Sequence, residues 1–108
     1  MLAIFFVLKH FVYIIYSKSA DKFYVGETPE VETRLLFHND TEKNTNSTKT
    51  GIPWELFWRL EVTDRGIARK IESHIKKMKS RKYYKDLLEH PEIAQKLIMK
   101  YQGPGSPR

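Results

Sequence analysis

Two short apolar runs close to the start of the chain predict a β-hairpin. Residues 11–17 are rich in aromatic and β-branched side chains, which favour strands. Turn-forming residues follow at 18–22, and a second apolar run covers 23–26. We therefore expect the two runs to pair as neighbouring strands.

A short helix is predicted after the hairpin. Thr28 is the expected N-cap, with Pro29 and Glu30 in the first turn, and the helix should end near Asn39 or Asp40. Its expected buried face consists of Val31, Leu35 and Leu36.

Residues 41–50 contain no apolar side chain, which predicts an exposed and mobile loop. After Gly51 and Pro53, residues 54–62 are strand-like. Trp54 and Trp58 lie four positions apart in this strand and are expected on the same side, where they serve packing rather than base stacking.

The clearest helical pattern follows the third strand. Thr63 or Asp64 can cap this helix, and its apolar residues recur at the spacing of one buried face: Ile67, Ile71, Ile75 and Met78. Residues 82–89 and 92–101 predict further helical stretches, separated by His90–Pro91, and the chain closes on a flexible tail. The order β-β-α-β-α-α predicts an α/β (α+β) fold, with a small three-stranded antiparallel sheet flanked by helices.

Composition narrows the function. The formal net charge of +6 favours an anionic partner such as nucleic acid, although a merely soluble basic protein gives the same number. The chain has no cysteine, which excludes disulfides, thiolate nucleophiles and cysteine-ligated zinc and fits a cytoplasmic location. The apolar segment 1–10 is interrupted by Lys9 and His10 and, with its continuation to Tyr16, is shorter than the roughly 20 residues of a membrane span, so no stable membrane association is expected.

Two tripeptides in the predicted hairpin form a recognisable pattern. Val12-Tyr13-Ile14 is followed on the next strand by Tyr24-Val25-Gly26. Arg34, His38 and Glu72 follow in order, on the first helix and on the long helix. This ordered set resembles the GIY-YIG nuclease family, over about residues 11–88, and in particular its small single-domain branch, which is similar to the N-terminal nuclease domain of the DNA excinucleases.

The resemblance has departures. Val12 stands where the signature has its first glycine, and Val25 where it has its second isoleucine. Many relatives have an asparagine after the glutamate, and some have a lysine where this chain has Glu27; no asparagine occurs after Asn46. The implied organisation is an apolar leader at 1–10, a nuclease domain at 11–90, and a C-terminal helix and flexible tail at 91–108, with no room for a specificity domain.

The chemistry of the five positions is compatible with cleavage of a phosphodiester. Two tyrosines on a hairpin can direct both hydroxyls into one cleft, although tyrosines in strands usually serve packing. Arg34 and His38 lie four apart on one helix and are expected to form a cationic ledge for a phosphate. Glu72 is at the edge of its buried stripe, and a single carboxylate suits Mg²⁺, which keeps several waters.

The resemblance implies a catalytic set of Tyr13, Tyr24, Arg34, His38 and Glu72. Glu72 would hold Mg²⁺, with Mn²⁺ as a substitute, and Arg34 would neutralise charge on the phosphate. Tyr24 is the first choice to accept the proton of the attacking water, while Tyr13 orients water or phosphate and His38 assists.

DNA is the expected partner, with RNA left open and no prediction of oligomeric state. Basic residues expected to contact nucleic acid are Lys49, Lys76, Lys77, Lys79, Arg81 and Lys82, although a solvated helix face is an alternative for most of them. Two other functions stay open: a non-catalytic nucleic-acid-binding module on the same scaffold, and a protein-interaction or membrane-tethered adaptor using the apolar leader.

Overall fold

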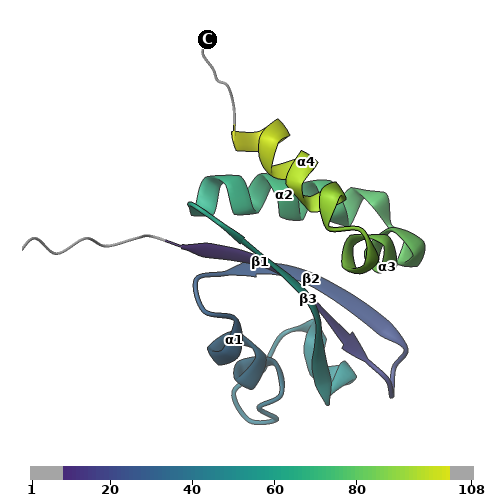
Figure 1. The fold of residues 1–108 in the computed structure, drawn as a ribbon. Helices are drawn as coiled ribbons and strands as arrows, with labels where there is room; N and C mark the ends of the chain where they lie inside the picture. Colours follow the sequence, from purple (N-terminus) through teal and green to yellow (C-terminus); the bar gives the residue numbers. More distant parts are fainter. Residues whose placement is uncertain (1–8, 103–108) are drawn as a thin grey trace, which may run out of the picture.

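The computed structural model describes residues 9–102, which form three strands, four α-helices and one short 3-10 helix (Figure 1). Residues 1–8 of the leader predicted at 1–10, and residues 103–108 of the predicted tail, lie outside the described residues, and His10 is already part of the first strand. The elements, in order, are β1 His10–Ser17, β2 Lys22–Thr28, α1 Val31–His38, the short 3-10 helix η1 Ser47–Gly51, β3 Trp54–Val62, α2 Arg65–Met78, α3 Arg81–Glu89 and α4 Pro91–Gln102.

The fold class predicted from the sequence is confirmed. The sheet is antiparallel with the order β2-β1-β3, so the first strand of the hairpin is its centre. Helices α2, α3 and α4 cover one face of the sheet, and α1 covers the other (Figure 1). None of the helices among residues 9–102 combines the length and the apolar character needed to cross a membrane.

Alternation along β1 divides the apolar residues between two cores. Val12 and Ile14 face α2, and a cluster that includes Ile71 and Ile75 fills the space beneath that helix. Tyr13 and Ile15 face the other way, towards α1. The larger core therefore anchors α2, and the smaller one surrounds Tyr13.

The expectation that Trp54 and Trp58 share one side is wrong. Ile14 pairs with Trp58 but Ile15 pairs with Leu56, so β3 carries one extra residue between them. Such a bulge reverses the facing of the residues beyond it. Trp58 consequently packs in the larger core and Trp54 in the smaller one, beside Tyr13.

Helix boundaries and faces also required corrections. The N-cap of α1 is Glu30 rather than Thr28, whose hydroxyl instead accepts a hydrogen bond from the Glu30 amide. Leu36 and Met78 were expected on buried faces but are 74% and 45% exposed. Asp64 caps α2 as predicted, by accepting a hydrogen bond from the Ile67 amide at 2.9 Å.

Candidate active site

Tyr13 lies at the centre of the sheet, directly opposite Gly26 on β2. Its ring packs so closely on Gly26 that a Cβ atom at that position would lie 2.5 Å from the Tyr13 hydroxyl oxygen. A glycine is therefore required opposite Tyr13, which explains in physical terms why the second tripeptide ends in one. Tyr13 itself is only 2% exposed, so its ring has little space in which to move.

The hydroxyl of Tyr13 forms a hydrogen bond with His38, the last residue of α1. The Tyr13 oxygen and His38 Nε2 are 2.8 Å apart, and the other ring nitrogen, Nδ1, lies 2.9 Å from Thr48 Oγ1. His38 is completely buried. The last turn of α1 and the 3-10 helix η1 therefore hold this imidazole between them.

The polar loop before β3 determines which ring nitrogen carries the proton. Asn46 Oδ1 accepts from the Thr48 amide, so this atom is an acceptor and the Thr48 hydroxyl must donate to it. Asn44 Nδ2 donates to the His38 carbonyl and to Thr48 Oγ1. Because Thr48 Oγ1 then acts only as an acceptor towards His38, Nδ1 carries the proton and Nε2 accepts from the Tyr13 hydroxyl.

This loop was predicted to be exposed and mobile, and for two of its residues that prediction is wrong. Asn44 is 0% and Thr48 3% exposed. Their amide and hydroxyl groups satisfy buried polar atoms of His38, and the Thr48 carbonyl accepts from the Trp54 indole at 2.7 Å. Gly51 is needed at the end of η1 because a side chain there would overlap the Trp54 ring.

Burial and charge set the protonation states of the pair. Burial, assisted by the nearby Arg34 guanidinium, lowers the pKa of His38 to about 4, so its imidazole is neutral at pH 7. Burial also raises the pKa of Tyr13 to about 12, an effect that Arg34 opposes and that the charges of Tyr24 and Glu72 increase. The expected cationic ledge is therefore wrong for His38, because the ring faces inward, uncharged, behind Tyr13.

Arg34 is the cation closest in sequence to His38, and its charge affects the pKa of both Tyr13 and His38. It is half-buried one turn before His38, with its guanidinium carbon 4.8 Å from the centre of the Phe37 ring. Within residues 9–102 it forms no ion pair with a carboxylate. A guanidinium in this state is available to an incoming phosphate.

Tyr24, Glu72 and Lys76 complete the site from β2 and α2. The ring centre of Tyr24 lies 5.1 Å from that of His38 and 6.4 Å from that of Tyr13. Lys76 Nζ is 5.9 Å from the centre of the Tyr24 ring and 3.0 Å from Glu72 Oε2. The Glu72 side chain is 17% exposed, so its carboxylate is only partly solvated.

The residues predicted to bind nucleic acid do not form one free basic surface. Lys76 is paired with Glu72, Arg81 with Asp21 at 2.9 Å, and Lys82 with Asp86 at 2.8 Å. The others, Lys49, Lys77 and Lys79, are exposed and form no ion pair with any carboxylate in the described part of the chain.

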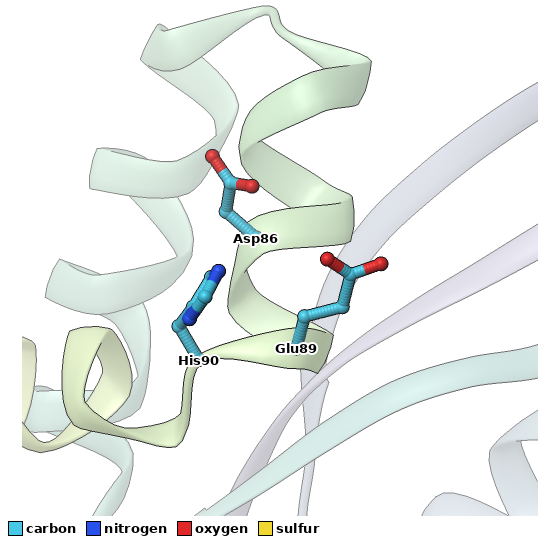
Figure 2. Close-up of side chains that lie close together, drawn as sticks. All are labelled: Asp86, Glu89 and His90. Atoms are coloured by element: carbon cyan, nitrogen blue, oxygen red, sulfur yellow. The ribbon is translucent and has the colours of Figure 1, made fainter.

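A metal ion could be held at two places in the described residues. Asp86, Glu89 and His90 gather at the end of α3 (Figure 2), with ligand atoms within 4.8 Å of one another. They are mostly exposed, and Asp86 is already paired with Lys82, so we assign no site to them. Glu72 offers one carboxylate beside the tyrosines, which fits a hard cation that completes its shell with water and phosphate oxygens.

Sequence reasoning missed two residues of the site, Asn44 and Thr48, and it missed the pairing of Lys76 with Glu72. Asn44 and Thr48 belong to a polar stretch. A polar composition does not distinguish side chains that face solvent from side chains that hydrogen-bond to a buried histidine. For Lys76, its position four residues after Glu72 was a usable signal, because oppositely charged residues at that spacing pair on a helix.

Comparison with known proteins bears on this arrangement. Neither a curated protein nor a solved structure matches the chain significantly. Residues 9–85 match the family model of the GIY-YIG catalytic domain. This domain is a nuclease that typically depends on a divalent metal ion, which implies a nucleic-acid substrate. The match spans more than half of the chain and contains every residue of the site described above, and the chain therefore belongs to the GIY-YIG family.

Proposed function

We propose that the protein is a metal-dependent endonuclease that hydrolyses phosphodiester bonds in DNA. The observation that supports this best is the neutral His38 behind Tyr13, with Arg34 and Glu72 beside them. This cluster combines a proton acceptor, a cation for phosphate and a carboxylate for a metal, which are the groups that phosphodiester hydrolysis needs.

Glu72 is the proposed ligand of the metal, with Mg²⁺ as the first choice and Mn²⁺ as a substitute. When bound there, the ion would supply positive charge to the scissile phosphate and its leaving oxygen. Lys76 already places a cation 3.0 Å from the Glu72 carboxylate, which supports the view that this carboxylate is built to face positive charge.

Arg34 is proposed to bind the non-bridging oxygens of the phosphate. Its guanidinium has no carboxylate partner within residues 9–102 and affects the pKa of both Tyr13 and His38, so it lies close to the proposed reaction centre. Charge accumulates on the phosphate oxygens as water attacks, and a fixed cation stabilises that state more than the ground state.

The proton of the attacking water is proposed to pass through Tyr13 to His38. The water gives its proton to the Tyr13 oxygen as the Tyr13 hydroxyl proton moves to His38 Nε2, and the hydroxide forms the new bond to phosphorus while the bond to the leaving oxygen breaks. This differs from the sequence-based choice of Tyr24, because Tyr13 has a proton acceptor at 2.8 Å. Tyr24, which is half-buried, would instead orient the water.

The biological setting is a finer proposal. We infer that the chain acts in repair or DNA turnover in the cytoplasm, as a generic or structure-selective nuclease similar to the N-terminal nuclease domain of the DNA excinucleases. The net charge of +6 supports a polyanionic substrate but does not separate DNA from RNA.

Cleavage of a labelled panel of linear, nicked, branched and single-stranded DNA and a matched RNA tests the proposal. With Mg²⁺ or Mn²⁺, the wild type should cut, Glu72→Gln should lose at least about 100-fold in rate, and Glu89→Gln, an exposed acid elsewhere, should not. Binding in EDTA should survive in all three. Full activity of Glu72→Gln would remove the metal assignment, and binding by the wild type without cutting would favour a non-catalytic module.

A further inference from the structure

A groove lies between α2 and α4, and none of the candidate active-site residues lines it. Its volume is about 540 Å³, and its lining includes Arg69, Lys70, Ser73, His74, Lys77 and Tyr101. We call it the α2–α4 groove. No acidic residue lines it.

The cations of the α2–α4 groove differ from those elsewhere on the helices. Arg69, Lys70 and Lys77 are exposed, and none of them forms an ion pair with a carboxylate of residues 9–102. Lys100 of α4 is close enough for its charge, together with that of Lys77, to lower the pKa of His74, after the larger effect of burial. Positive charge is therefore concentrated in the groove without internal compensation.

The walls of the groove are held in place by the protein's own packing. His74 Nδ1 and the Tyr101 hydroxyl oxygen are 2.9 Å apart, which links α2 to α4. Beneath them, Ala94 and Leu97 of α4 are buried in the same core as Ile71 of α2. Because this concave cationic surface is already formed in the free protein, little conformational entropy is lost when a ligand binds to it.

The spacing of the cations suits a strand of phosphates. Arg69 and Lys77 are eight residues apart on one helix, which is about 12 Å at the helical rise. Along the axis of a DNA duplex, each strand carries one phosphate per about 3.4 Å, so roughly three phosphates of one strand fall within that length. Arg69 also lies one turn from Glu72, so a strand in the groove could continue towards the proposed site of cleavage.

We propose that the α2–α4 groove binds the sugar–phosphate backbone of the nucleic-acid substrate outside the bond that is cleaved. The inference rests on the proposed function only in taking nucleic acid as the substrate. It places the main electrostatic contact on Arg69, Lys70 and Lys77, whereas Arg81 and Lys82 at the start of α3 are compensated by Asp21 and Asp86.

The test compares two triple variants of equal charge. One variant is Arg69→Gln, Lys70→Gln and Lys77→Gln; the control is Lys9→Gln, Lys18→Gln and Lys43→Gln, whose positions lie outside α2 and α4. Binding of a 20-base-pair duplex and of a 20-nucleotide single strand is measured in EDTA by fluorescence anisotropy over a series of salt concentrations, and thermal melting confirms that both variants fold.

Loss of three phosphate contacts should lower the slope of log K against log salt by about 2 to 3 and weaken binding at least about ten-fold in the groove variant alone. Equal binding by the two triple variants, or no binding of either nucleic acid by the wild type, would overturn the inference. Binding that depends on the groove without cleavage by the wild type would instead overturn only the proposed nuclease activity.

Discussion

Burial of a neutral His38 makes the stability of the fold depend on pH. In the unfolded chain the pKa of His38 is 6.5, and in the folded protein it is about 4. Between these values the unfolded state binds a proton that the folded state does not, so the free energy of unfolding falls as the pH is lowered. At about 1.4 kcal/mol for each pH unit, the full loss is at most about 3.5 kcal/mol. This is a large part of the 5–15 kcal/mol typical of a domain.

Urea denaturation at several pH values between 7.5 and 4 measures this loss. Other groups titrate in the same range, so the informative quantity is the difference between the wild type and His38→Gln. The variant should be less stable at pH 7.5, because the buried hydrogen bonds are perturbed, but its stability should fall less steeply on acidification. His90→Gln, which removes an exposed histidine, should follow the wild-type curve.

The result that would refute the reasoning is a parallel pH dependence in the wild type and His38→Gln. That outcome would mean that His38 takes up its proton in the folded protein near its ordinary pKa, as an exposed histidine does. The proposed proton acceptor would then be charged below pH 6.5, and the derivation of the tautomer from Thr48 would have to be abandoned with it.

Two further substitutions test how Tyr13 and His38 are held. Gly26→Ala should displace the Tyr13 ring, lower the free energy of unfolding by about 1–3 kcal/mol in urea denaturation, and reduce cleavage to the level of Tyr13→Phe. Gly66→Ala, at an exposed glycine, should leave stability unchanged or raise it slightly. Unchanged activity in Gly26→Ala would contradict the tight packing. Thr48→Val keeps the side-chain shape but leaves the His38 Nδ1–H group without an acceptor, so it should lower the free energy of unfolding by about 1–3 kcal/mol and slow cleavage. Thr50→Val, in the same 3-10 helix, should do neither. Equal effects of the two substitutions would contradict the role given to Thr48.

Local pattern was sufficient for most of the fold. The β3 bounds agree with the sequence, and the N-cap of α2 was one of the two residues expected, because alternation and capping depend on neighbours in the chain. The side of the sheet on which Trp54 lies could not be predicted from the local sequence pattern. It depends on one extra residue in β3, a bulge that only the pairing with β1 defines.

The structure brings the five residues proposed from the sequence close together, but the sequence could not predict their protonation states. An arginine and a histidine four apart on a helix indicate a shared face, and the sequence offers no way to tell that Arg34 is half-buried while His38 is completely enclosed. That difference depends on where the loop of residues 39–53 folds back. Once Thr48 and Asn44 cover the ring, burial changes His38 from an expected cation into a neutral acceptor.

The same burial that makes His38 useful also makes it costly. A histidine in water would be a stronger base, but it would be protonated in part near neutral pH and would repel Arg34 beside it. Enclosing the ring removes that charge and aims Nε2 at the Tyr13 hydroxyl, while the stability lost on acidification is the consequence. The loop that carries Thr48 therefore belongs to the proposed reaction centre as much as the helix that carries His38, because without the Thr48 oxygen the imidazole would have no fixed proton and no fixed direction.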